Sequence, residues 1–498
     1  MIKLNELKNL TKKNNSNGFP QDNFERFERI NETKLHMKER ILCGSILEYF
    51  LHSENRRCNY LLAALLLALP PILGLIYIKF FGVNAVFWDQ WELVPLIEKM
   101  YTGSLNLSDL FSQHNEHRIF FPRIIMLILA YMTHYNNIAE MCFSWILSLA
   151  TMLLIFRMYL LDSGNSTRTL VKFIPVAWLL FSFRQYENIL WGWQIQIYLC
   201  ILGFVASIYM LEKVDKVDIN ILLAAFFGVI SSFSFINGLL VWPIGLVYLF
   251  LAKKIKGKFS LVWAVTGVLV CGIYFYNWIK PPYHPSLFFM LKNPFISMTY
   301  FFVNIGSPLS SEKYSAFGNG VLLSTLMLFT FIIIINKQII IKNIKWVSFI
   351  LFSLFSSLSL TVGRSGFGIE QALSSRYVTI ISLGIIGIYL IFSDLHSRFE
   401  NGIYKKYSIL YGIILSLILV GIIVGYEGNI VVGEQTHDSR ELTKSNLINY
   451  KSKSDDDLRL LYPSPDILRD RAKILEKYNL NVFCDKWQLE IISGVRKA

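Results

Sequence analysis

The first long apolar stretch of the chain reads YLLAALLLALPPILGLIY, from Tyr60 to Tyr77, and it contains no charged residue. A helix needs about 20 mostly apolar residues to cross the hydrocarbon core of a bilayer. The stretch extends to Phe81 with one lysine, so its length fits one crossing. Residues 1–58 before it are polar and mixed in charge, so we expect no cleavable signal peptide and an uncleaved anchor at 60–81. A second uncharged run, from Tyr407 to Tyr426, predicts another transmembrane helix.

The composition of the whole chain supports this interpretation. Of the 498 residues, 54% are hydrophobic and 17% are charged, and the mean hydropathy is +0.44. Soluble chains carry roughly a quarter charged residues, so this chain has too few to cover a soluble surface. We predict an all-α polytopic membrane protein and exclude a conventional soluble enzyme, a disordered chain and a secreted disulfide scaffold. The six cysteines form no CxxC pair and indicate neither a metal site nor a disulfide framework.

About eleven transmembrane helices are predicted from the apolar runs. They lie near 60–81, 139–161, 169–184, 193–211, 219–237, 239–252, 259–279, 319–336, 345–363, 377–393 and 407–425. The apolar stretch from Ile119 to Met132 is ambiguous, because counting it as a span reverses the orientation of everything after it. Placing it flat in the membrane interface puts the basic inter-span segments on the cytoplasmic side, as the positive-inside rule requires. The net charge of +13 then follows from topology and does not indicate nucleic-acid binding.

This topology places the N-terminus in the cytoplasm and the C-terminus in the periplasm of a bacterial inner membrane. The predicted regions are a cytoplasmic tail at 1–59, a transmembrane domain at 60–425 with an outer loop at 82–138, and a small periplasmic tail at 426–498. Aromatic residues among charges at 24–30 predict an interfacial helix. In the periplasmic tail, Ser464 and Pro465 open a predicted soluble helix. The outer segments are richer than the inner ones in His, Trp, Pro, Glu and Arg, so we expect the chemistry there.

The first outer loop begins with FWDQWE, from Phe87 to Glu92. Asp89 and Glu92 are three residues apart and share one face if the segment is helical. A carboxylate held among aromatic side chains at the membrane surface is partly desolvated, which raises its pKa and suits a general base acting on a hydroxyl. A solvated interfacial helix that merely carries acids has the same pattern.

The same loop contains HNEHRIFFPR, from His114 to Arg123. Arg118 and Arg123 can bind phosphate oxygens through paired N–H donors. Glu116 and His117 can bind a sugar or assist proton transfer. The two histidines have the spacing of half a metal site, but no third ligand follows at a diagnostic distance, so we do not predict zinc.

A second cluster lies between two predicted spans. It combines the side chains of Glu187, Trp191, Trp193 and Gln194. Sugar rings stack on indole faces, and their hydroxyls bind amides and carboxylates. An aromatic belt at the membrane interface explains the tryptophans equally well, but it does not explain Glu187.

A third cluster contains Arg364 and Arg376 at the outer ends of two spans. Arginines at this side oppose the positive-inside trend, which indicates an anionic partner. Glu370 can neutralise one of them within the protein. The remaining positive charge favours a phosphate or pyrophosphate ligand.

An acidic pair just after the first span, followed by a His- and Arg-rich amphipathic segment along the membrane, resembles the GT-C superfamily of membrane glycosyltransferases. The resemblance covers most of the membrane region and implies a sugar donor carried on polyprenyl phosphate. It also implies that an acidic residue of the first loop is the catalytic base, here Asp89 with Glu92 as the neighbouring candidate. The pair is spaced Asp-x-x-Glu, whereas adjacent acids are typical of the superfamily. The size, the basic balance and the outer tail are similar to bacterial O-antigen-modifying, serotype-converting glucosyltransferases.

The expected reaction is inverting transfer of a sugar, glucose by this resemblance, from an undecaprenyl-phosphate donor to a lipid-linked or lipopolysaccharide glycan. The phosphate leaves towards the arginines, so no cofactor is obligatory, although a divalent cation is compatible with the scheme. The expected partners are therefore lipids and glycans, without nucleic acid. The alternatives are a transporter or flippase for a lipid-linked glycan and a polysaccharide polymerase. Charges clustered in outer loops argue against transport, because transporters usually place them near the midplane.

Overall fold

The computed structural model describes residues 56–214, 219–253, 258–334, 337–398 and 405–484. The chain divides into residues 1–62, of which only 56–62 are described, and residues 63–498, which contain every feature discussed below. The predicted cytoplasmic tail at 1–59, with its interfacial helix at 24–30, therefore lies almost wholly outside the described residues. Residues 254–257 and 399–404, which belong to two of the predicted basic inter-span segments, also lie outside the described residues.

The described part of the chain is all-helical, with no β-strand. Seven of its helices are long and apolar enough to cross a membrane. They are α4 (Arg56–Phe81), α8 (Asn137–Ser163), α11 (Ile195–Glu212), α17 (Lys313–Ile334), α18 (Lys337–Arg364), α19 (Ser375–Arg398) and α20 (Lys405–Ile448). The other four predicted spans coincide with shorter helices, namely α9 (Thr167–Leu180), α12 (Ile219–Ser232), α13 (Val241–Leu251) and α14 (Lys258–Phe275).

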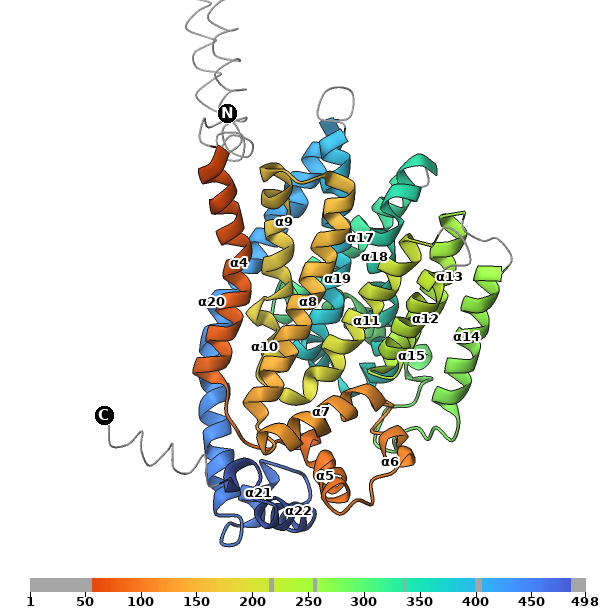
Figure 1. Ribbon diagram of the computed structural model, residues 1–498. Coiled ribbons are helices and arrows are strands. Elements are labelled where there is room, and N and C mark those ends of the chain that lie inside the picture. The colour runs from red at the N-terminus through yellow and green to blue at the C-terminus, as the bar shows by residue number, and fades with distance from the viewer. Residues whose placement is uncertain (1–55, 215–218, 254–257, 335–336, 399–404, 485–498) are drawn as a thin grey trace, which may run out of the picture. The chain divides into compact units, whose positions relative to one another are not determined.

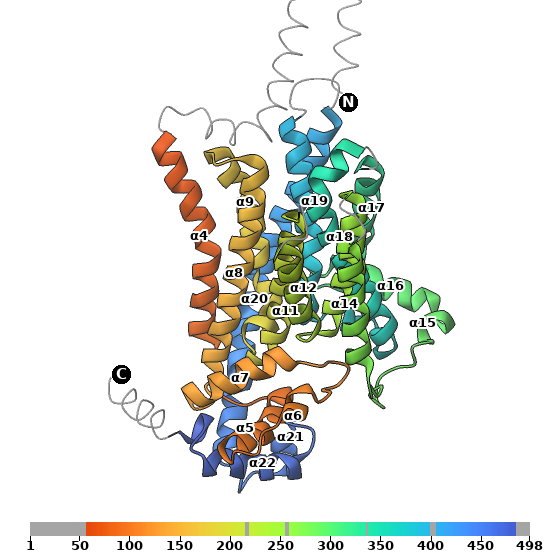
Figure 2. The ribbon, with the colours of Figure 1, turned by 45° about the vertical axis from the view of Figure 1, so that its right-hand side comes forward.

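The long helices run side by side, with α11 and α19 in the interior of the bundle (Figures 1 and 2). Nearly all residues of α11 and α19 are buried, whereas α17 and α20 leave most of their residues on the surface. The exposed residues of the outer helices are large and apolar, such as Leu65, Val268 and Leu328. A helix that is apolar all round either lies in a protein interior or faces lipid, so this pattern is that of a membrane bundle.

Two prolines in the middle of α4 show how the bundle satisfies its backbone. Pro70 has no N–H, so the carbonyl of Leu66 loses its partner within the helix. The indole N–H of Trp178, on α9, donates to that carbonyl at 3.2 Å. Trp145 of α8 adds a second bond to α4 by donating to the carbonyl of Pro71 at 2.9 Å. A replacement donor for a carbonyl freed by proline is required where water is absent.

Short helices cover one end of the bundle. The loop after α4 forms the 3₁₀ helix η1 (Trp88–Leu93) and the helices α5 (Val94–Tyr101), α6 (Leu107–Phe111) and α7 (Phe120–Thr133). The ambiguous stretch at 119–132 is thus a separate short helix, and it runs across the end of the bundle rather than along it (Figures 1 and 2). Further short elements are α10 (Tyr186–Ile189), α15 (Phe289–Lys292), α16 (Pro294–Gly306), η2 (Phe183–Gln185), η3 (Gly192–Gln194), η4 (Ile236–Leu240), η5 (Ser365–Phe367) and η6 (Ile369–Leu373).

The C-terminal region differs from the prediction. The helix α20 does not end near 425 but continues to Ile448, followed by α21 (Asp455–Arg459), α22 (Pro465–Lys477) and η7 (Asn481–Phe483). The predicted tail helix at 464–479 is confirmed as α22. These elements pack on the first loop, where Leu458, Leu468 and Leu475 share a buried core with Trp91. The loop and the tail, almost 400 residues apart, therefore meet at one end of the bundle.

Candidate functional site

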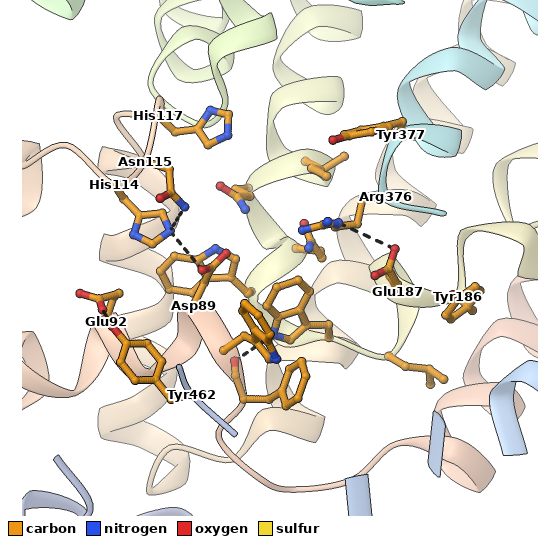
Figure 3. A pocket seen from close by; sticks show the side chains of 18 of the residues that line it. Asp89, Glu92, His114, Asn115, His117, Tyr186, Glu187, Arg376, Tyr377 and Tyr462 are labelled. Atoms are coloured by element: carbon orange, nitrogen blue, oxygen red, sulfur yellow. Dashed lines mark hydrogen bonds and ion pairs between the residues drawn. The ribbon is translucent and has the colours of Figure 1, made fainter. Parts of the chain in front are cut away.

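A cavity of about 1220 Å³ lies where the first loop, the tail and the ends of several long helices meet (Figure 3). It is large enough for more than one sugar unit, since pockets of ~300–1000 Å³ enclose drug-sized ligands. Its polar lining includes Asp89, Glu92, Gln113, His114, Asn115, His117, Glu187, Gln194, Gln196, Arg364, Arg376, Gln435, Thr436, Ser439, Arg440 and Ser464. Its aromatic lining includes Phe87, Trp88, Tyr186, Trp191, Trp193, Phe235, Tyr283, Tyr377 and Tyr462.

Asp89 enters the cavity from η1, which follows α4 after the connecting residues 82–87. Trp88, the residue before it, has a left-handed φ of 48°, which is unusual for a bulky side chain. The tail stabilises this conformation, since the N–H of Trp88 donates to the carbonyl of Leu461 at 2.9 Å. The Oδ1 atom of Asp89 lies 3.7 Å from Nε2 of His114, and the two side chains face each other in the cavity (Figure 3).

The expected rise in the pKa of Asp89 is wrong. Burial does raise this pKa, but the contact with His114 at 3.7 Å and the positive charge of Arg376 outweigh it, so the pKa lies below its usual value. Desolvation was foreseeable from the aromatic sequence, whereas the cations come from other segments. Asp89 is therefore an ionised carboxylate at neutral pH, ready to accept a proton.

Glu92 has a different environment, although it is only three residues away. Arg471 of α22 donates to both of its oxygens, at 2.7 Å and 3.2 Å, and the hydroxyl of Tyr462 donates to Oε1. Burial raises the pKa of Glu92, but these two partners outweigh burial and hold the pKa below its usual value. Both oxygens thus bind the tail. Asp89, in contrast, faces the open cavity.

We expect Arg471→Ala to loosen the tail, because it removes a two-point hydrogen bond between α22 and the first loop. Hydrogen bonds to charged groups contribute ~1.5–3 kcal/mol, and partial exposure of this pair places the loss near the lower end. Limited trypsin digestion of the detergent-solubilised protein should cleave the tail faster. Lys473→Ala is the matched control, since Lys473 lies on the same helix and pairs with Asp470 within that helix. Equal cleavage rates in both variants and the wild type would contradict this role.

Glu116 lies at the edge of a second cavity rather than in the first. The guanidinium of Arg364 donates to its Oε1. Nε2 of His117 and Nε2 of His284 lie 3.5 Å and 3.6 Å from its two oxygens. Burial raises the pKa of Glu116, but His117, Arg364 and His284 outweigh it and lower the pKa to about 2. Burial lowers the pKa of His117 to about 4, so this imidazole is neutral at pH 7.

The structure does not bring Arg118 or Arg123 to the cavity. Arg118 donates to the backbone carbonyls of Tyr274 and Phe111, at 2.6 Å and 2.8 Å. Arg123 donates to the carbonyl of Leu110 at 3.0 Å. Both therefore hold the first loop in place, and we leave them out of the phosphate site. The sequence could not separate these roles, because a guanidinium binds carbonyl and phosphate oxygens with the same donors.

The predicted sugar-binding cluster lines the cavity as a group. Trp191 and Trp193 are almost fully buried, and the exposed indole is that of Trp88. The residue between them is Gly192, and a larger residue would not fit there. A Cβ at this position would lie 2.3 Å from a carboxylate oxygen of Glu140. Glu140 is a buried acid whose Oε2 accepts a hydrogen bond from Gln90 in η1 at 2.8 Å. This contact fixes η1, and therefore Asp89, against α8.

The two predicted phosphate-binding arginines both line the cavity, but each has an acidic neighbour. Arg364 pairs with Glu116, as described above. Nε of Arg376 lies 3.8 Å from Oε2 of Glu187, which also accepts hydrogen bonds from Ser374 and Ser375 (Figure 3). Glu370 pairs with Lys313 instead, at 3.1 Å. The expected pairing with Glu370 is therefore wrong, and so is the expected surplus of positive charge, because Glu116 of the first loop and Glu187 of α10 supply one acid to each arginine.

Several lining residues were missed by the sequence analysis. Gln435, Thr436, Ser439 and Arg440 lie on the outer part of α20, which was interpreted as a tail. The signal for this continuation is present, since no proline interrupts the chain between Tyr426 and the end of the helix. Tyr462 and Ser464 lie between α21 and α22. The C-terminal region interpreted as a tail thus forms part of the lining of the large cavity.

The second cavity, of about 620 Å³, is mainly apolar. Its apolar walls come from η4 and α13, from the loop at 278–287 and from the outer half of α18, including Leu240, Pro243, Trp278, Leu287, Phe355 and Leu358. It shares four residues with the large cavity, namely His117, Phe235, Arg364 and Tyr377. The two cavities therefore meet at a basic and aromatic boundary. Among the described residues, no group of three or more His, Cys, Asp and Glu side chains could hold a metal ion.

Comparisons with known proteins give little further information. No family model matches the chain, and no solved structure matches it. An uncharacterized protein of Archaeoglobus fulgidus is 26% identical over 248 residues, which cover 43% of this chain. The chain spans about 61% of the length of that relative. The function is therefore inferred from the site itself.

Proposed function

We propose that this protein is a membrane glycosyltransferase that takes a sugar from undecaprenyl phosphate and transfers it to a lipid-linked glycan. The observation that carries the proposal is the meeting of the two cavities at Arg364. The second, apolar cavity, called the apolar groove below, is joined to the polar large cavity. This arrangement suits an amphiphilic donor whose isoprenoid chain lies in the groove and whose sugar lies in the large cavity. The donor phosphate then lies at the boundary, beside Arg364, with Arg376 in the adjoining lining of the large cavity.

The large cavity supplies the groups that inverting transfer needs. Asp89 takes the proton from an acceptor hydroxyl, whose oxygen attacks the anomeric carbon of the donor sugar. The bond from that carbon to the phosphate oxygen breaks, and its electron pair leaves with undecaprenyl phosphate. Arg376 and Arg364 stabilise the charge that develops on the phosphate. Asp89 later releases its proton to water.

The same proposal includes eleven crossings, with the N-terminus in the cytoplasm and the C-terminus in the periplasm of the bacterial inner membrane. Its support is that the cavity lining comes from the loop after α4, from 186–197, from 235, from 283, from 364–377 and from the outer part of α20. With α9, α12, α13 and α14 counted as crossings, all of these segments lie on one side. A crossing number of seven would divide them between two sides.

Reporter fusions test this topology. We expect periplasmic signals after residues 104, 283 and 452, and cytoplasmic signals after 216, 255 and 401. Two fusion sites lie on opposite sides of the membrane when an odd number of proposed crossings separates them, and on the same side when the number is even. A cytoplasmic signal at 104 or 452 would place the cavity on the wrong side for a periplasmic glycan acceptor.

The function is tested by comparing lipopolysaccharide glycans, by mass spectrometry, in cells with and without the protein. The proposal predicts an added hexose on the glycan, with glucose and O-antigen as the first candidates. A change in glycan chain length without an added branch would indicate a polymerase. An accumulation of lipid-linked glycan inside the cell without the protein would indicate a flippase.

A further inference from the structure

Arg440 lines the cavity, and one of its side-chain nitrogens has no hydrogen-bond partner among the described residues. Nη1 of Arg440 is buried without a hydrogen-bond partner. Its guanidinium carbon lies 3.0 Å from the ring centroid of Phe87. This contact fixes the position of the charge but leaves the N–H groups available for hydrogen bonding.

The acids of the cavity are already engaged elsewhere. Glu92 binds Arg471 and Tyr462, and Asp89 faces His114. Glu187, whose charge acts on Arg440, accepts hydrogen bonds from two serines and lies beside Arg376. A guanidinium with a buried N–H that lacks a hydrogen-bond partner is unfavourable, so its natural complement is an anion bound in the cavity.

Arg440 lies away from the residues that the two cavities share. Those residues are His117, Phe235, Arg364 and Tyr377, and neither Arg440 nor Arg376 is among them. Its contact with Phe87 places Arg440 beside the start of η1, the helix that carries Asp89. Its lining neighbours are hydroxyl and amide side chains of α20 and the tail.

We propose that Arg440 binds an oxyanion carried by the acceptor, a phosphate or a carboxylate on a sugar. This assignment rests on the proposed function and adds the acceptor class to it, an anionic rather than a neutral glycan. Arg440 thereby orients the acceptor hydroxyl towards Asp89, while Arg376 and Arg364 face the donor. A guanidinium suits both anions, because its paired N–H groups match the two oxygens of either.

The test is isothermal titration calorimetry, which measures ligand binding to the full-length protein in detergent. The probes are glucose 6-phosphate, glucuronate, neutral glucose and undecaprenyl phosphate. Arg440→Met keeps the length and the apolar contact with Phe87 but removes the charge. We expect it to weaken binding of at least one charged sugar by about tenfold or more, with glucose and undecaprenyl phosphate unchanged. Arg440→Lys should recover part of the loss, because it restores the charge without the fork.

Arg376→Ala is the matched variant. It should weaken the binding of undecaprenyl phosphate and leave the binding of the charged sugars unchanged. The phosphate and carboxylate probes distinguish the two anion sources. Equal binding of charged sugars by Arg440→Met and the wild type would overturn the inference, as would a wild type that does not prefer them to glucose. An equal loss of undecaprenyl phosphate in Arg440→Met and Arg376→Ala would move Arg440 to the donor side. The wild type could also bind charged sugars through Arg440 but fail to bind undecaprenyl phosphate. That result would support the anion site at Arg440 and contradict the proposed lipid donor.

Discussion

Asp89→Asn is expected to lower the rate of sugar transfer by about 10²–10⁴-fold, the usual contribution of a general base. The substitution keeps the size of the side chain and most of its hydrogen bonding, and it removes the oxygen that accepts the proton. Asp89 is suited to this role because it faces the cavity and is ionised at neutral pH, whereas the oxygens of Glu92 bind the tail. The rate is measured as label transferred from the lipid donor to glycan.

The matched control for Asp89 is Glu98→Gln. Glu98 is an acid of the same loop that does not line the cavity and lies 3.6 Å from Lys477 of the tail. It should transfer at the wild-type rate, with equal protein in the membrane. A transfer rate of Asp89→Asn within a few fold of the control would remove the catalytic assignment. If Glu92→Gln alone lost activity while its tail stayed resistant to trypsin, the roles of the two acids would be reversed.

Arg376→Ala is expected to lower the rate by about 10²–10³-fold, as for the loss of one donor to a developing oxyanion. Arg376 is a cleaner test than Arg364, because Arg364→Ala would leave the buried carboxylate of Glu116 without its main partner. Arg376→Lys should restore only part of the rate, since an ammonium lacks two parallel donors. Single-turnover assays at saturating donor separate the chemical step from donor binding.

Arg459→Ala is the control for Arg376, because Arg459 is an exposed arginine of α21 that pairs with Asp456. Wild-type rates in both arginine variants would show that the donor phosphate is bound elsewhere. A loss that is the same for alanine and lysine would indicate that packing, rather than charge, is what Arg376 contributes.

The local part of the fold follows from the sequence, and the long-range part does not. The apolar run at 60–77 becomes α4 because its length and composition leave no other structure in lipid. The length of α20 was underestimated, because hydropathy marks where a helix leaves lipid and not where it ends. The docking of α22 on η1 depends on Arg471 and Glu92, which are 379 residues apart, and no periodicity encodes such a contact.

The candidate site was predicted in part for the same reason. Trp191, Glu187 and Asp89 could be recognised because carboxylates beside indoles are rare within apolar sequence. Arg118 could not be assigned, since its partners are backbone carbonyls that only the folded loop brings within reach. Arg440 was missed because an arginine in a polar stretch has no distinctive local pattern.

Sugar transfer by the purified protein tests the central claim most directly. The wild type and Asp89→Asn are incubated in detergent with undecaprenyl phosphate carrying labelled glucose and with lipid-linked glycan from cells that lack the protein. The account predicts that label moves to the glycan with the wild type, with an equal amount of undecaprenyl phosphate released and inverted anomeric configuration. It predicts almost no transfer with Asp89→Asn. Label that stays on the lipid donor with both proteins, when the same glycan carries added glucose in cells that contain the wild type, would contradict the account.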